Sequence, residues 1–209
     1  MARPANFSTK DRILGAAEEL FAQHGFAATS LRQVTGLAAV NIAAVNYHFG
    51  SKENLVNEVF RRRMDDMTAR RLQQLEAAQR EHPGELEPVL AAFIEPALAL
   101  AQDRNRRSAL APVIARSYPE HNESLRRFLS DQYGHVLRHF GKALAACLPG
   151  IDKDSLYWRL DFLAGALTYA MSDFGMIKRP GGTSEAAHRA RAARELIRFA
   201  AAGLQAPLK

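Results

Sequence analysis

The sequence predicts an all-α protein with a small N-terminal domain, residues 1–50, and a larger C-terminal domain, residues 51–209. Apolar residues recur at helical spacing along most of the chain, which is the primary sign of helices packed on a core. Breaks such as His82-Pro83-Gly84 and Pro149-Gly150 separate these segments. With 209 residues and 47% hydrophobic residues, the chain can bury a sizeable core.

The first expected helix follows a short arm, residues 1–7. Ser8 is a good N-cap, and Asp11 lies near the positive end of the helix dipole. The inward residues repeat at helical spacing and are Ile13, Leu14, Ala17, Leu20 and Phe21. We expect the helix to end at Gly25 and to cover the next two.

Residues 30–49 predict two short helices joined by a tight turn. Ser30 and Gln33 have the spacing of a capping box, and Asn41 suits the N-cap of the second helix, from about Ile42 to Phe49. The expected buried residues are Leu31, Val34, Ala38, Val45 and Phe49. This arrangement is a helix-turn-helix, although a plain helical hairpin in an all-α core has the same residue types.

The second short helix carries side chains suited to the major groove of DNA. Asn46 can form two hydrogen bonds to an adenine edge, and Ile42, Ala43 and Ala44 offer apolar surface to thymine methyl groups. Backbone phosphates can be contacted by Tyr47 and His48. Ser51-Lys52 offers a further anion site at the start of the next helix.

The order of these residues resembles the signature of TetR/AcrR-family transcriptional regulators. In that family a Val-Ser-x-x-x-Leu-Tyr-x-His-Phe-x-x-Lys-x-x-Leu pattern spans the recognition helix and the start of helix 4, and residues 40–55 follow it. The likeness extends upstream through Ile13-Leu14, Leu20-Phe21, Gly25-Phe26 and Thr29-Ser30. The DNA-binding residues predicted from the chemistry and the resemblance are Thr29, Ser30, Asn41, Ile42, Ala43, Ala44, Asn46, Tyr47, His48 and Lys52.

The chain departs from the family pattern at Ala39, Gly36 and Asn46. Ala39 stands where the turn usually has Gly, and a left-handed alanine costs of order 1 kcal/mol. Gly36 lies inside the first helix of the motif, where a glycine costs about 1 kcal/mol relative to alanine. Asn46 replaces a Tyr credited with a phosphate contact, and Asn41 replaces Ser, although both are good caps. The Asn-x-Ala-Ala-Val-Asn-Tyr-His-Phe-Gly-Ser-Lys run is similar to the PsrA-like, fatty-acid-responsive branch.

The resemblance implies a homodimeric regulator in the cytoplasm, most simply a repressor. Its head would bind a palindromic operator, and its C-terminal domain would bind a small hydrophobic effector, such as a fatty acid or acyl-CoA, that releases the DNA. The expected fold is thus a three-helix DNA-binding domain followed by a helical effector-binding and dimerisation domain.

A long helix over about residues 51–80 is expected to connect the two domains. Its inward residues are predicted to be Leu55, Val59, Met67, Leu72 and Leu75. The arginines at 61–63 and 70–71 then form a basic surface, which either touches flanking phosphates or is simply a solvated face.

Proline-interrupted apolar segments follow, at 88–102 with Pro96 inside and at 108–118 with Pro112 inside. Proline kinks a helix, and kinked helices can enclose a ligand pocket, although each apolar residue also suits a plain core. Arg104, Arg106 and Arg107 at the junction are either candidates for acyl-CoA phosphates or a solvated loop. The predicted effector-binding residues are Phe93, Ile94, Leu98, Arg106, Arg107, Leu110, Val113, Ile114 and Tyr118.

The last two expected helices, from Asp152 or Asp154 to about Met176 and from Thr183 or Ser184 onward, resemble a dimerisation surface. The first is apolar over more than one face, and the second has an alanine-rich stripe that allows close packing. In TetR-like proteins these helices form a four-helix bundle between subunits. The predicted dimerisation residues are Trp158, Phe162, Ala166, Tyr169, Ala193, Leu196, Ile197 and Ala200.

Other functions find little support in the sequence. Asp131, His135 and His139 share a helical stripe between 123 and 148, but without an HExxH motif, so no metal or other cofactor is predicted. Cys147 is the single cysteine, and the chain has no signal-like segment and no apolar run long enough for a membrane helix. The chain shows no nucleophile motif, which argues against a small helical enzyme. The net charge of +6 keeps a non-specific, architectural DNA-binding protein open.

Overall fold

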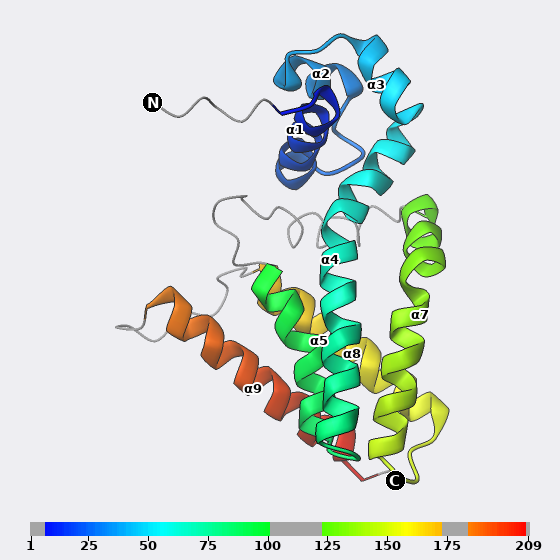
Figure 1. Ribbon diagram of the computed structural model, residues 1–209, viewed down its shortest axis with the longest axis vertical. Coiled ribbons are helices and arrows are strands. Elements are labelled where there is room, and N and C mark those ends of the chain that lie inside the picture. The colour runs from blue at the N-terminus through cyan, green and yellow to red at the C-terminus, as the bar shows by residue number, and fades with distance from the viewer. Residues whose placement is uncertain (1–6, 101–122, 173–183, 208–209) are drawn as a thin grey trace. The chain divides into compact units, whose positions relative to one another are not determined.

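The computed structural model describes residues 7–100, 123–172 and 184–207, and every regular element among them is an α-helix (Figure 1). The helices are α1 (Thr9–His24), α2 (Leu31–Ala38), α3 (Ile42–Phe49), α4 (Lys52–Glu81), α5 (Leu86–Leu100), α7 (Glu123–Cys147), α8 (Lys153–Ser172) and α9 (Glu185–Gln205). The all-α prediction is confirmed. The segments predicted at 108–118, the turn at 179–182 and the end near Met176 lie outside the described residues.

The described residues divide into two compact units. The first contains residues 7–65 and 123–130, and the second contains 66–100, 131–172 and 184–207. The helix α4 begins in the first unit and ends in the second. A domain boundary at residue 50, directly after α3, stays a prediction.

The core of the first unit forms where α1, α2 and α3 meet the start of α4. Ser8 caps α1 by accepting from the Asp11 N–H at 3.1 Å, and Gly25 ends it with a φ of 83°. The rings of Phe21 and Phe26 lie 5.1 Å apart, and Phe26 lies 5.9 Å from Phe60 of α4. The other fully buried side chains here include Ile13, Ala17, Val34, Val45 and Leu55. Most of the predicted inward residues of these helices are thereby confirmed, whereas Leu20 and Leu31 are half-buried.

The turn between α2 and α3 is built by local hydrogen bonds and by one side chain from α1. Ser30 and Gln33 form the predicted capping box, and Asn41 accepts from the Ala44 N–H at 2.9 Å. Ala39 takes the left-handed conformation, with φ 51° and ψ 52°. The guanidinium of Arg12 donates to the carbonyls of Ala38 and Ala39 at 2.5 and 2.6 Å, so α1 holds the end of α2.

Replacing Ala39 with glycine is expected to raise the free energy of unfolding by about 1 kcal/mol, because glycine adopts the left-handed conformation without a Cβ clash. Urea denaturation at fixed protein concentration measures the change. Ala69→Gly in the middle of α4 is the control, since Ala69 is also exposed but helical. That variant should lose about 1 kcal/mol. Two changes of the same sign would refute the conformational explanation.

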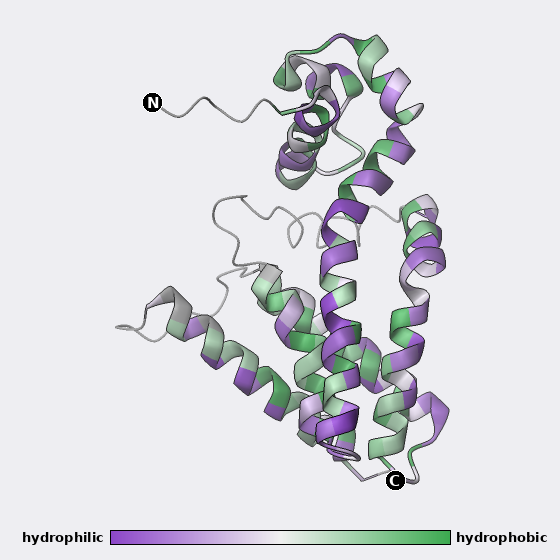
Figure 2. Cartoon of the chain, viewed as in Figure 1, coloured by the Kyte–Doolittle hydropathy of each residue, from purple (hydrophilic) through white to green (hydrophobic). Residues whose placement is uncertain are grey.

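The core of the second unit lies around α5, which packs against both α8 and α9. Figure 2 shows α5 largely in hydrophobic colours, whereas α4 is mostly hydrophilic with hydrophobic residues at intervals. Pro96 lies inside α5 as predicted, and Ser184 caps α9. The buried side chains of this unit include Val89, Leu90, Ile94, Phe140, Leu144, Leu163, Leu167 and Leu204.

The predicted basic surface of α4 is wrong in part, because two of its five arginines are buried. Arg63 is 9% exposed and Arg71 is 8% exposed, so neither faces solvent. Arg61 pairs with Glu58 on its own helix, and Arg62 lies 3.5 Å from Asp11 of α1. Arg70 is exposed as predicted. Both of the proposed roles, a phosphate contact and a solvated face, are therefore wrong for Arg63 and Arg71.

Candidate DNA-binding site

The exposed face of α3 is the candidate surface for DNA. Tyr47 is 85% exposed and Ile42 is 45% exposed, and Ala43, Asn46 and His48 are exposed as well. Ala44 is half-buried, whereas Val45 and Phe49 fix the opposite face in the core. The exposed face of this short helix therefore carries the amide of Asn46, the polar rings of Tyr47 and His48, and a small apolar area.

Three further residues predicted to bind DNA differ in exposure: the N-caps Ser30 and Asn41 are exposed, whereas Thr29 is buried. The side chains of Ser30 and Asn41 are exposed, although each already accepts a backbone N–H of its own helix. Thr29 is 1% exposed, and its hydroxyl donates to the Gly25 carbonyl at 2.7 Å. Its role is therefore to join the end of α1 to the start of α2, and the prediction that it contacts DNA does not fit its burial.

The start of α4 is a second place where an anion is favoured. The Ser51 hydroxyl accepts from the Asn54 N–H at 3.1 Å, and Lys52 is the first residue of the helix. Hydrogen bonding to backbone N–H, together with the Ser51 hydroxyl, lowers the pKa of Glu53. Because this helix terminus stabilises a carboxylate, it also suits a phosphate placed beside Lys52.

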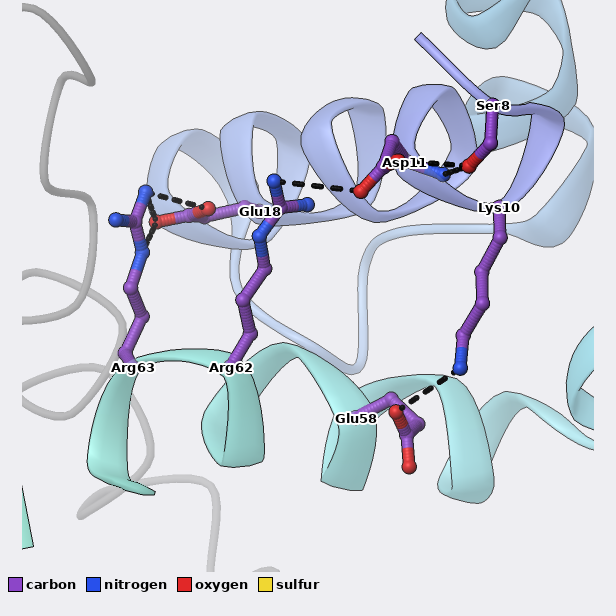
Figure 3. Close-up of polar contacts among 7 residues, drawn as sticks. All are labelled: Ser8, Lys10, Asp11, Glu18, Glu58, Arg62 and Arg63. Carbon is purple, nitrogen blue, oxygen red and sulfur yellow. Dashed lines mark hydrogen bonds and ion pairs between the residues drawn. The ribbon is translucent and has the colours of Figure 1, made fainter. Parts of the chain in front are cut away.

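Three ion pairs hold α4 against α1 within this unit (Figure 3). Arg63 binds Glu18 in a bidentate arrangement, with Nε–Oε1 at 2.9 Å and Nη2–Oε2 at 3.0 Å. Arg62 reaches Asp11, and Lys10 lies 3.6 Å from Glu58. The side chains of Arg63 and Glu18 are each 10% exposed, so this pair is buried. The start of α4 is thereby tied to the helix that supports the helix-turn-helix.

The predicted effector residues fall into two groups. Phe93, Ile94 and Leu98 of α5 are buried in the second unit. The others lie outside the described residues, as Arg104 does, and are Arg106, Arg107, Leu110, Val113, Ile114 and Tyr118. The pocket prediction therefore stays a prediction for these positions.

The predicted dimerisation residues also separate by exposure. Trp158, Phe162 and Tyr169 of α8 are 56%, 67% and 41% exposed, and Phe199 of α9, which was not predicted, is 69% exposed. Ala166, Ala193 and Leu196 are half-buried. Ile197 and Ala200 are buried within their own subunit, so they do not suit an intersubunit contact. We call Trp158, Phe162, Tyr169 and Phe199 the aromatic surface.

The polar stripe on α7 forms contacts within its own helix. His139 Nδ1 lies 2.8 Å from the carbonyl of His135, one turn earlier, and Asp131 is exposed. Within residues 7–100, 123–172 and 184–207, no three acidic, histidine or cysteine side chains are grouped to hold a metal ion. None of the described helices is long and apolar enough to span a bilayer.

Four residues with structural roles were not predicted. Arg12 fixes the turn, Glu18 and Arg63 form the buried pair, and Arg71 donates from Nε to the Phe93 carbonyl at 2.8 Å. A signal was present for the two arginines on α4, because they lie four residues from apolar positions that were predicted to be buried.

These elements define a helix-turn-helix DNA-binding protein with a helical C-terminal part. Residues 13–59 match the family model described as "Bacterial regulatory proteins, tetR family". Residues 91–203, more than half of the chain, match the model described as "Tetracyclin repressor-like, C-terminal domain". The chain belongs to the TetR family, which consists of regulators rather than enzymes.

Curated relatives match the N-terminal part. The probable HTH-type transcriptional regulator YttP of Bacillus subtilis is 44% identical over 57 residues, which are 25% of this chain and 28% of that protein. The HTH-type transcriptional regulator QacR of Staphylococcus aureus is 42% identical over 50 residues, 24% of this chain and 27% of that protein. The chain thus spans little more than a quarter of the length of these relatives.

Solved structures match nearly the whole chain. A putative tetR family transcription regulator from Shewanella sp. PV-4 superposes with a TM-score of 0.66 at 18% identity. The match covers 92% of this chain and 98% of that one. At this identity the likeness concerns the fold, and it agrees with the two-part helical architecture described above.

Proposed function

We propose that the protein is a homodimeric repressor that binds a palindromic operator and releases it when a small hydrophobic effector binds. The effector class that we favour is a fatty acid or acyl-CoA, by the resemblance of residues 41–52 to the PsrA-like branch. The protein would act in the cytoplasm, where it meets the chromosome. The exposed face of α3, with Asn46 at its centre, is the observation that carries the proposal.

The surface chemistry of α3 supports reading of bases rather than attraction to phosphates alone. Asn46 is exposed and can pair with the N6 and N7 atoms of adenine, and Ala43 leaves room for close approach to the base edges. Lys52 and the start of α4 supply phosphate contacts, which set the register of the helix in the groove. Both kinds of contact are required for a sequence-specific protein.

Dimerisation accounts for operator symmetry. Two copies related by a two-fold axis would present two α3 helices to half-sites about 34–36 Å apart, or a multiple of that spacing. The aromatic surface on α8 and α9 is the candidate contact between copies. Contiguous exposed apolar groups mark interaction sites, and the exposed rings of Trp158 and Phe162 lie 6.1 Å apart.

Release by the effector follows from a population shift. The effector favours a conformation in which the two heads no longer match the half-site spacing, and α4 contributes residues to both units of the chain. Coupling of this kind is reciprocal, so operator DNA should weaken effector binding by the same factor.

Asn46→Ala tests base reading. It is expected to reduce affinity for the operator by about 1–3 kcal/mol per half-site and to leave affinity for a random duplex nearly unchanged. Fluorescence anisotropy at fixed salt measures both. The contrasting variant is Lys52→Ala, which should weaken binding of both duplexes and reduce the salt slope by about one per half-site. Equal losses on the two duplexes for Asn46→Ala would exclude it as a base reader.

The functional test is binding to a promoter fragment from the protein's own genomic neighbourhood, compared with a random duplex at the same salt. We expect specific binding that palmitoyl-CoA or oleate releases. Specific binding that ignores both compounds would keep the regulator and reject this ligand class. Equal binding of both duplexes with a steep salt dependence would instead indicate an architectural DNA-binding protein.

A further inference from the structure

Arg71 of α4 is a buried cation in an apolar part of the second unit. It is 8% exposed, its Nε donates to the Phe93 carbonyl of α5 at 2.8 Å, and its Cζ lies 4.0 Å from the centre of the Phe93 ring. The Phe93 ring in turn meets Phe140 of α7 edge to face, 5.1 Å between centres. The guanidinium therefore lies where α4, α5 and α7 converge.

The remaining donors of this guanidinium have no partner in the described part of the chain. A guanidinium has five N–H donors, and the carbonyl of Phe93 uses one of them. No acidic side chain among the described residues pairs with Arg71. Desolvation lowers the pKa of Arg71 to about 10, so the group is still charged at pH 7.

A second buried polar side chain lies one turn earlier on the same helix. Thr68 is 8% exposed and occupies position i−3 relative to Arg71, which places the two on one face of α4. Within the described residues its hydroxyl makes no hydrogen bond, whereas Thr168 of α8 donates to the carbonyl four residues before it. Two polar groups with unused donors thus lie next to each other in an apolar setting.

Such an arrangement is costly for a folded chain unless an anion joins it. A buried charge is retained where a partner of opposite sign and further hydrogen bonds compensate for lost water. The planar fork of arginine matches a carboxylate, to which it donates two parallel hydrogen bonds. The Phe93 ring beside the guanidinium and the Phe140 ring beside Phe93 require that the rest of such a ligand be apolar.

We infer that Arg71, aided by Thr68, binds the carboxylate of an effector whose remaining surface is apolar. This inference rests on the proposed function, because it assigns the charged end of the effector to one residue of the C-terminal domain. It favours free carboxylic acids over neutral compounds of the same shape. It also gives α4, which carries the head's Arg62 and Arg63, a direct contact with the ligand.

Isothermal titration calorimetry without DNA tests the inference with matched pairs of ligands. The probes are dodecanoate and dodecan-1-ol, oleate and oleyl alcohol, and inorganic phosphate, at pH 7.5 and below micelle formation. We expect at least one acid to bind about 10- to 100-fold more tightly than its alcohol, as hydrogen bonds to a charged group contribute. Phosphate, which lacks an apolar body, should bind much more weakly than the acid.

Arg71→Gln should abolish the preference for the acid and leave binding of the alcohol unchanged, which also shows that the variant is folded. Arg70→Gln is the matched control, because it removes the same charge from an exposed neighbour and should keep the preference. Thr68→Val, which has nearly the same shape, is the milder variant should Arg71→Gln not fold. It should weaken the acid about tenfold and spare the alcohol.

The acidic side chains outside the described residues are Asp103, Glu120 and Asp173, and they provide the competing explanation, an internal counterion. Asp103→Asn, Glu120→Gln and Asp173→Asn should each leave the preference unchanged. The inference is overturned if the acid and the alcohol bind wild type equally, if neither binds, if the preference survives Arg71→Gln, or if it arises only in one of these three variants. Since no DNA is present, failure here leaves the operator experiment to decide the proposed function independently.

Discussion

Replacing Glu18 with alanine is expected to destabilise the protein by about 3–5 kcal/mol, the usual cost of removing one partner of a buried ion pair. Glu18 and Arg63 are bidentate and each side chain is 10% exposed, so the variant leaves a buried guanidinium without its carboxylate. Little water can reach Arg63 to replace those hydrogen bonds. For a chain of this length, the melting temperature should fall by roughly 6–20 °C.

Glu19→Ala is the control for Glu18→Ala, because Glu19 is the next residue of α1 and is exposed. We expect a change within about 0.5 kcal/mol there. A double variant, Glu18→Leu with Arg63→Met, replaces the pair with apolar side chains and should recover most of the loss. All measurements need one protein concentration, since dimerisation contributes to the observed stability. Similar effects of Glu18→Ala and Glu19→Ala would refute the assignment.

The local features of the head could be predicted because their causes lie within four residues of each other. Ser30 and Gln33 are three positions apart, and Asn41 caps the helix that begins at the next residue. Ala39 stands at the position where the family usually has glycine, which made it a candidate for the left-handed conformation, and its φ is 51°. Each of these signals depends on the backbone geometry of a single turn, so it can be recognised without knowledge of the long-range contact from Arg12.

The buried arginines could not be predicted from a charge pattern, because their partners are distant in sequence. Glu18 precedes Arg63 by 45 residues, and the Phe93 carbonyl follows Arg71 by 22. Positions 59, 63, 67, 71 and 75 are all buried on α4, with an arginine at every second one. The spacing placed these arginines on the inward face, but the usual preference of arginine for solvent favoured the opposite conclusion.

The alanine-rich stripe of α9 shows a different ambiguity. Ile197, Ala200, Ala201 and Leu204 recur at helical spacing, and such a stripe fits either the subunit's own core or a partner helix. In the structure these residues are buried, and α9 packs on α5. Periodicity shows that a helix has apolar faces. It does not show which face packs inside the subunit, because that depends on the other helices of the fold.

Replacing Phe162 with glutamate is expected to separate the proposed dimer into monomers. Phe162 is 67% exposed, and its ring lies 6.1 Å from that of Trp158, one turn earlier on α8. Exposed aromatic residues at the centre of an interface commonly contribute 2 kcal/mol or more. In a two-fold interface the change occurs on both copies, and each buried glutamate would also lose its hydration. The dimer dissociation constant should rise by at least roughly 30-fold.

Sedimentation equilibrium measures the dissociation constant, and anisotropy with a full operator and with a single half-site measures the consequence. Affinity for the full operator should fall steeply, because the two heads are no longer held together in one dimer. Affinity for a single half-site should be unchanged, because α3 is unchanged. Leu137→Glu is the matched control, since Leu137 is 59% exposed on α7 and lies outside the aromatic surface. A dimer that persists in Phe162→Glu, or dissociates equally in Leu137→Glu, would place the subunit contact elsewhere.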